Sequence, residues 1–208
     1  MTVTDVNVVK SAIFERPDDA NKGTLGSLLC VCGSYGMAGA AVMSAKGALR
    51  TGIGLAKCAL PRSIYPIVAQ TILESVYYPL SENADGRISK VNVPFLVSES
   101  CKSSATLVGC GLGVCDDTLK IVFSLIENST TPLVLDADAL NCVAKQPEIL
   151  LRKKAPIIIT PHPGEMSRLT GLATPLVNAE RERVALDFAQ KYGVVTVLKG
   201  AGTVIASP

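Results

Sequence analysis

Four groups of polar and glycine residues each follow a short apolar run, and they contain the residue types that could do chemistry. Carboxylates can bind a cation or accept a proton, histidine can contact a ligand, and glycine-rich backbone can approach a phosphate. Because the carboxyl ends of parallel strands meet at one edge of a sheet, we expect the groups to form one ligand-binding site. They are Gly109–Gly113, Asp136–Asp138, Thr160–Glu165 and Lys199–Thr203.

The only histidine in the sequence, His162, lies between two prolines. The prolines stiffen the backbone and keep His162 out of a helix interior. A lone histidine is often a structural residue. Here the rigid setting, the position after a predicted strand, and Glu165 three residues later favour a ligand contact.

The segment Asp136-Ala137-Asp138 has two interpretations. Its carboxylates can hold a cation or orient a hydroxyl group. Alternatively, Asp138 caps a helix that begins at the next residue. We prefer Asp136 as the active-site residue.

Two further glycine-rich segments could approach a ligand closely. Gly33–Ala40 joins a predicted strand to a predicted helix, where backbone N–H groups favour anions, but it matches no dinucleotide or Walker A motif. Lys199–Thr203 could hold a nucleotide phosphate or could be an ordinary hairpin.

Short apolar runs alternate with helical patterns along the chain. This alternation predicts an α/β fold with a mainly parallel central sheet and helices on both faces. Without a repeat or a linker, we expect a single domain over residues 1–208. The predicted strands are Leu28–Cys32, Leu55–Leu60, Ser75–Leu80, Ala105–Gly109, Leu133–Asp136, Pro156–Thr160, Val194–Lys199 and Thr203–Ala206. The predicted helices are Gly39–Thr51, Ser63–Gln70, Val91–Ser98, Asp116–Asn128, Ala139–Lys153 with a break at Pro147, Gly164–Thr170 and Val177–Tyr192.

Composition excludes several classes of protein. With 48% hydrophobic and 18% charged residues, the 208-residue chain is not mainly disordered. A net charge of +2 and 4% aromatic residues argue against a nucleic-acid or membrane-surface partner. The uncharged stretch Gly23–Ala45 is long enough to span a membrane, but its glycines and serines favour a strand, a turn and a helix.

The cysteines and the amino terminus indicate the cellular compartment of the protein. Seven cysteines cannot all pair internally, and Met1–Asp5 shows no beginning of a secretory signal. We therefore expect a cytoplasmic protein with reduced thiols.

Five motifs, taken in order, resemble a known family. They are NKGTLGSLLCVCGSYGMAGAAVMSAKGALRTGIGLAKCALP, GCGLG, LVLDADAL, IIITPHPGEMSRL and VVTVLKGAGTVI, and they run from Asn21 to the end of the chain. The series resembles the ADP- or ATP-dependent NAD(P)H-hydrate dehydratases of the ribokinase-like superfamily. The resemblance implies a repair enzyme that restores NADH or NADPH from its S hydrate with ADP or ATP and Mg²⁺.

The resemblance also implies roles for residues within the matching motifs. Asp136 and Glu165 stand where related vitamin kinases keep acids near the metal and phosphates, which implies a supporting catalytic role. No residue is assigned as a metal ligand. The residues that would contact the hydrated dinucleotide are Ala40, Gly111, Gly113 and His162. The residues that would lie along the nucleotide donor are Lys199, Gly200, Ala201, Gly202 and Thr203.

The sequence departs from the family pattern at three places. Cys110 replaces the proline of GPGLG, and Asn21 stands where histidine is common. The glycine-rich anion hole with the catalytic aspartate does not occur before Pro208. We therefore expect the domain to be incomplete at its carboxyl end, with its main base beyond Pro208, and the 208-residue chain to be nearly inactive alone.

Two alternatives stay open. One is a kinase of a small vitamin precursor, such as a hydroxymethylpyrimidine or a thiazole, although those kinases more often carry asparagine where His162 stands. The other is a non-catalytic chain that binds a nucleotide or needs a partner segment. Bacterial members of the resembled family suggest a homotetramer.

Overall fold

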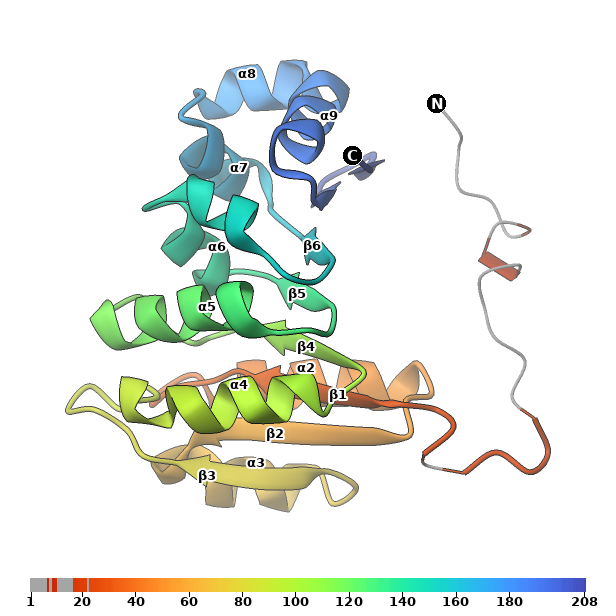
Figure 1. Cartoon of the computed structure of the whole chain (residues 1–208), viewed down its shortest axis with the longest axis vertical. Helices are drawn as coiled ribbons and strands as arrows, with labels where there is room; N and C mark the ends of the chain where they lie inside the picture. The colour runs from red at the N-terminus through yellow and green to blue at the C-terminus, as the bar shows by residue number, and fades with distance from the viewer. Residues whose placement is uncertain (1–6, 8, 11–16, 22) are drawn as a thin grey trace.

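The computed structural model of the chain describes residues 7, 9–10, 17–21 and 23–208, and a single eight-stranded sheet runs through it (Figure 1). The prediction about a secretory signal concerns Met1–Asp5, which lie outside the described residues. None of the helices in the described ranges has the length and apolar character needed to cross a membrane.

The strands lie in the order β3-β2-β1-β4-β5-β6-β7-β8. Neighbours pair in parallel from β3 to β7, and β8 pairs antiparallel with β7. The predicted α/β fold with a mainly parallel sheet is confirmed. The strands are β1 (Ser27–Val31), β2 (Leu55–Pro61), β3 (Val76–Leu80), β4 (Ala105–Val108), β5 (Leu133–Leu135), β6 (Ile157–Ile159), β7 (Val195–Leu198) and β8 (Val204–Ala206).

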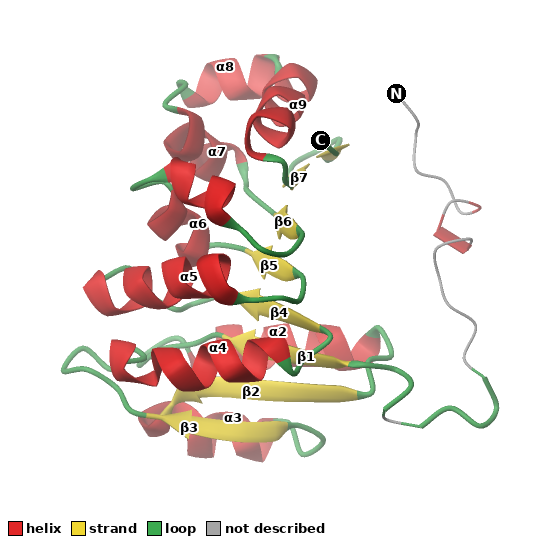
Figure 2. Cartoon of the chain, in the orientation of Figure 1, coloured by secondary structure: helices red, strands yellow, loops and turns green. Residues whose placement is uncertain are grey.

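Helices connect the parallel strands, as Figure 2 shows. They are α2 (Ala38–Arg50), α3 (Tyr65–Thr71), α4 (Val93–Cys101), α5 (Asp116–Asn128), α6 (Asp138–Val143), α7 (Pro163–Thr170), α8 (Thr174–Ala179) and α9 (Arg181–Tyr192). Short 3₁₀ helices occupy Arg62–Ile64, Lys90–Asn92 and Pro147–Arg152.

The predicted single helix Val177–Tyr192 is wrong, because the chain forms two helices that meet at Glu180. Glu180 has φ −124° and ψ 41°, outside the helical region. Val177 and Val184 are both buried. Their seven-residue spacing keeps them on one face of a continuous helix too, so periodicity could not reveal the break.

The two faces of the sheet bury separate apolar clusters. Alternate side chains of a strand point to opposite faces. In β1, Cys30 packs with the side chains of α2 and α3, whereas Leu29 and Val31 join a larger cluster built with α4, α5, α6, α7 and α9. Figure 1 shows α4 and α5 in front of the sheet and α2 and α3 behind it.

The face that carries α2 is less completely covered over β5 to β8. Val134 and Ile158 are direct neighbours in the sheet, are only partly buried, and belong to neither cluster. Val197 pairs with Ile205, which is 65% exposed, on the same face. Apolar side chains of this part of the sheet thus lack a helix over them among the described residues.

Candidate functional site

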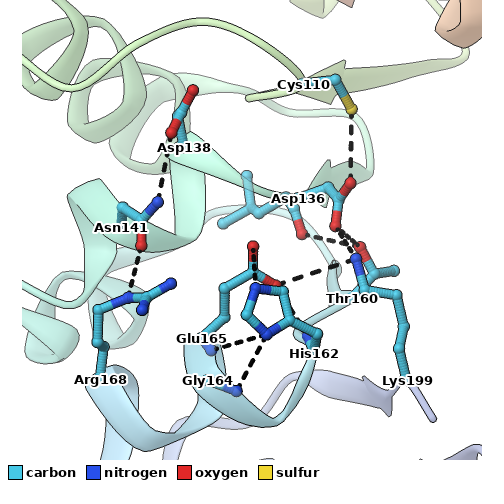
Figure 3. A network of polar contacts seen from close by, with 11 residues as sticks. Cys110, Asp136, Asp138, Asn141, Thr160, His162, Gly164, Glu165, Arg168 and Lys199 are labelled. Atoms are coloured by element: carbon cyan, nitrogen blue, oxygen red, sulfur yellow. Dashed lines mark hydrogen bonds and ion pairs between the residues drawn. The ribbon is translucent and has the colours of Figure 1, made fainter. Parts of the chain in front are cut away.

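Three residues that directly follow parallel strands meet at the carboxyl edge of the sheet (Figure 3). Lys199 Nζ and Thr160 Oγ1 each donate a hydrogen bond to Asp136 Oδ1, and both donor–acceptor distances are 2.7 Å. The last residue of each preceding strand is buried in the larger cluster, so alternation turns these three side chains toward the α2 face. The predicted convergence of the segments after β5, β6 and β7 is therefore present.

The electrostatic surroundings of Asp136 favour its ionised form. Burial alone would raise its pKa, but the hydrogen bonds from Lys199 and Thr160, together with the charge of Lys199, outweigh it and lower the pKa below the ordinary value. Asp136 Oδ2 also lies 3.6 Å from the Sγ of Cys110. Asp136 is thus a carboxylate that fixes the position of Lys199 at the site.

His162 caps the amino end of α7. Its Nδ1 accepts from the N–H groups of Gly164 and Glu165 over 3.0 and 3.3 Å, and Glu165 Oε2 accepts from the His162 N–H over 2.8 Å. Because Nδ1 is an acceptor, the proton of a neutral ring resides on Nε2, which lies 3.4 Å from Glu165 Oε1. The imidazole therefore caps the helix. Because it is 51% exposed, it is also accessible to a ligand.

Glu165 connects this helix start to Lys199. Its side chain is only 6% exposed, and its Oε2 lies 3.9 Å from Lys199 Nζ. The Lys199 N–H donates to the carbonyl of Pro161 over 2.8 Å. Lys199 therefore stands between two carboxylates, those of Asp136 and Glu165.

The glycine-rich loops after β1 and β4 are bound to each other. The N–H of Gly33 donates to the carbonyl of Cys110 over 2.9 Å, and Ser34 Oγ donates to the carbonyl of Gly111 over 2.8 Å. Gly111 has φ +65°, and a Cβ atom there would lie 2.6 Å from the Cβ of Ala40. Ala40 and Gly111, both predicted to contact substrate, are thus adjacent.

Asp138 does not cap α6. Its Oδ2 instead accepts from the Gly113 N–H over 2.8 Å, and α6 has no side-chain cap. Ala137, with φ 52°, is the only non-glycine residue of positive φ among the described residues. This conformation costs about 1–3 kcal/mol. It directs the carboxylate of Asp136 toward Lys199 and that of Asp138 toward the Gly113 N–H.

Asn141 and Arg168 extend the contacts of Asp138, and sequence analysis missed both. Asn141 Nδ2 donates to Asp138 Oδ1 over 3.3 Å, and Asn141 Oδ1 accepts from Arg168 Nε over 2.8 Å. Figure 3 shows these three side chains in a column beside His162. They come from α6 and α7, and no local sequence motif joins residues so far apart.

The turn between β7 and β8 is held by Arg181, the first residue of α9, which sequence analysis also missed. Arg181 Nη2 donates to the carbonyls of Leu198 and Gly202 over 2.8 and 3.4 Å. Gly200 has φ +154°, and a Cβ there would come within 2.8 Å of the guanidinium. Thr203 Oγ1 donates to the Gly200 carbonyl over 3.0 Å. The predicted nucleotide segment is therefore a supported turn, and its Ala201 is exposed.

A continuous series of contacts joins the residues predicted for substrate and for nucleotide. It runs from His162 through Glu165, Lys199 and Asp136 to Cys110, whose chain neighbour Gly111 touches Ala40. Gly113 lies two residues further on and is held by Asp138.

Comparisons with known proteins show the family to which the chain belongs. Residues 28–208 match the family described as NAD(P)H-hydrate dehydratase. The chain is 39% identical over 193 residues to a bifunctional NAD(P)H-hydrate repair enzyme of Thermofilum pendens, covering 93% of this chain and 37% of the relative. It is 32% identical over 196 residues to an ADP-dependent (S)-NAD(P)H-hydrate dehydratase of Neisseria meningitidis, covering 93% of this chain and 62% of that protein. It thus spans less than two thirds of either relative.

Solved structures give the same result. An ADP/ATP-dependent NAD(P)H-hydrate dehydratase from Bacillus subtilis, co-crystallised with ATP and Mg²⁺, superposes with a TM-score of 0.79 at 30% identity, covering 97% of this chain and 68% of that one. A ribokinase-like superfamily protein from Enterococcus faecalis superposes with a TM-score of 0.81 at 19% identity, covering 98% and 68%, which shows the ribokinase-like fold alone. By sequence and by fold, this chain belongs to the NAD(P)H-hydrate dehydratase family.

Proposed function

We propose that this chain binds the S hydrate of NADH or NADPH beside ADP or ATP and takes part in returning the hydrate to the reduced dinucleotide. The observation that carries the proposal is the series of contacts from His162 to Gly111, because it joins both predicted binding regions at one sheet edge. Membership of the dehydratase family supports the same reaction.

The reaction uses the nucleotide to make a better leaving group. A hydroxyl group leaves poorly, so the terminal phosphoryl group of the nucleotide is transferred to the hydrate's hydroxyl oxygen as the hydroxyl proton is removed. Phosphate then leaves with the C–O bond electrons, and loss of a ring proton restores the double bond. The overall products are NADH or NADPH, phosphate, and AMP or ADP.

The residues at the edge suit binding and charge stabilisation. Lys199 places a positive charge where the phosphates of the nucleotide would lie, and Asp136 and Glu165 hold that charge in position. Ala40 and Gly111 let the two glycine-rich loops pack closely at the predicted dinucleotide region, and His162 can offer its half-exposed imidazole to the ligand.

The donor groups fit a Mg²⁺ ion that arrives with a nucleotide. No cluster of three or more His, Cys, Asp and Glu side chains in the described part of the chain could hold a metal alone. Mg²⁺ commonly binds through one or two carboxylates together with phosphates and water, and Asp136 and Glu165 are the carboxylates available. When bound, the ion would neutralise charge on the transferring phosphoryl group.

Two further expectations belong to this proposal. The motifs of this chain do not include the expected main catalytic base, and Asp136 and Glu165 would act in support of it. The 208-residue chain would bind both ligands and turn over slowly. A homotetramer is also expected from the resemblance, and sedimentation velocity tests it.

In the deciding experiment, the protein is incubated with the S hydrate of NADH, with ADP or ATP, and with Mg²⁺. The return of the absorbance of reduced nicotinamide is then followed. Binding of both ligands, with turnover that rises in a longer form of the protein, supports the proposal. Full turnover by residues 1–208 alone would assign the base to the chain itself, with Asp136 or Asp138 tested first. Phosphorylation of a pyrimidine alcohol, or binding without turnover in any form, would contradict the proposal.

A further inference from the structure

A basic hollow of about 410 Å³ opens beside the site. It lies between the loop after β4, the end of α6 and the side of α7. The residues that line it are Val114, Asn141, Ala144, Lys145 and Arg168. Two of these carry a positive charge and none is a carboxylate.

Arg168 is oriented by a hydrogen bond to a neutral amide, that of Asn141, and not by a direct ion pair. Its Nε donates to Asn141 Oδ1 over 2.8 Å, and Asn141 in turn contacts the carboxylate of Asp138, which is occupied by the Gly113 N–H. The terminal nitrogens of the guanidinium make no hydrogen bond to a described residue. A guanidinium fixed in this way has the N–H groups of both terminal nitrogens left for an anion.

Lys145 adds a second cation to the same hollow. It is exposed, and its ammonium group forms neither a hydrogen bond nor an ion pair with the described residues. At one rim, Arg87 Nη1 donates to the Val114 carbonyl over 3.3 Å, while Asp85 pairs with Arg87 over 3.6 Å. Neither Lys145 nor Arg168 forms an ion pair with a described residue, unlike Lys199, which pairs with two carboxylates.

The hollow adjoins two residues expected to contact the dinucleotide. Val114 directly follows Gly113, and Arg168 Nη1 would lie 3.9 Å from a Cβ atom on Gly164, which contacts His162. A ligand held by Gly113 and His162 would thus extend past both cations.

We propose that the hollow lined by Asn141, Lys145 and Arg168 binds a phosphate group of a nucleotide ligand. Guanidinium and ammonium groups are the usual partners of phosphate oxygens. That this ligand is the dinucleotide or the nucleotide donor bound at the sheet edge rests on the proposed function. The phosphate could come from the pyrophosphate shared by NADH and NADPH, from the 2′-phosphate of NADPH, or from the donor nucleotide.

Calorimetric titration of the 208-residue protein with NADH, NADPH and ADP tests the proposal, using Arg168→Gln and Lys145→Gln. We expect each substitution to weaken binding of at least one of these ligands by about tenfold, the loss typical of one charged hydrogen bond. Arg50→Gln and Lys154→Gln remove exposed cations outside the hollow and should leave all affinities unchanged. The Lys145 side chain has no hydrogen bond or ion pair with a described residue to lose, so its variant separates ligand binding from folding.

The pattern of loss identifies the source of the phosphate. Equal weakening for NADH and NADPH assigns the shared pyrophosphate, weakening for NADPH alone assigns the 2′-phosphate, and weakening for ADP alone assigns the donor. Each of these results supports the phosphate site. Unchanged affinity for all three ligands in both variants would overturn it.

A titration with inorganic pyrophosphate separates this proposal from the proposed function. If the unsubstituted protein binds none of the three nucleotides, the proposed function fails, and pyrophosphate alone decides the hollow. Binding that weakens by about tenfold in both variants would then support the anion site. No binding, or equal binding by the variants and the unsubstituted protein, would overturn it.

Discussion

His162 has two roles at the start of α7, and substitution can separate them. Its Nδ1 accepts from two backbone N–H groups, whereas the half-exposed ring, whose Nε2 lies near Glu165, can meet a ligand. His162→Ala should lower the free energy of unfolding by about 1 kcal/mol through loss of the cap, and should weaken NADH binding further than that loss explains. Chemical denaturation and calorimetric titration measure the two effects.

His162→Asn is the matched control, because asparagine is a good cap but lacks the imidazole. We expect it to recover stability and not NADH affinity. If His162→Asn recovers both, the imidazole is structural and the ligand role assigned to His162 is wrong.

The lowered pKa of Asp136 predicts how the stability of the folded protein changes at acid pH. Its pKa is lowered in the folded protein, so its contribution to stability is complete above the ordinary value of 3.8 and disappears as pH falls through the lowered value. Asp136→Asn should therefore lower stability near pH 7, and its difference from the unsubstituted protein should shrink between about pH 5 and about pH 2. A constant difference across this range in urea denaturation would show that the Lys199 contact does not stabilise the ionised form.

At the scale of elements, the loop after β4 must pass close to α2. Gly111→Ala would place a Cβ 2.6 Å from Ala40 Cβ, at φ +65°. We expect a loss of about 2–5 kcal/mol from the left-handed conformation and overpacking, and weaker NADH binding, measured by denaturation and titration.

Gly52→Ala is the control for backbone conformation alone. Gly52 has φ +94°, and a Cβ there would meet nothing within 4 Å. It should cost about 1–2 kcal/mol and leave NADH affinity unchanged. Equal effects of the two substitutions would argue that the contact of Gly111 with Ala40 does not matter.

The elements were predictable where the sequence contains a local signal. The histidine between two prolines marks the start of α7, and the acids at Asp116 and Asp117 mark the start of α5. Arg181, Asn141 and Arg168 were not predictable, because each is placed by contacts with elements distant in sequence. Their residue types are those of any solvated helix face.

For the whole molecule, alternating strands and helices determine the parallel sheet and thereby the edge where the site forms. The covering of each sheet face was less predictable. The strands LVL of β5 and III of β6 are apolar throughout, which is typical of burial on both faces. The structure instead leaves Val134 and Ile158 only partly buried on the α2 face.

This partly covered face predicts how the isolated 208-residue chain behaves. Ile205, 65% exposed, lies beside Val197 on the same face as Val134 and Ile158, so an apolar surface extends from β5 to β8. We expect this surface to bind the dye ANS and to promote association at high protein concentration. Ile205→Glu should reduce both, measured by fluorescence and light scattering, and change stability by less than about 0.5 kcal/mol because the side chain is exposed. Leu151→Glu, at a 60% exposed leucine elsewhere, is the control. If both substitutions act alike, the effect is one of net charge, and the β5–β8 face is not the surface responsible.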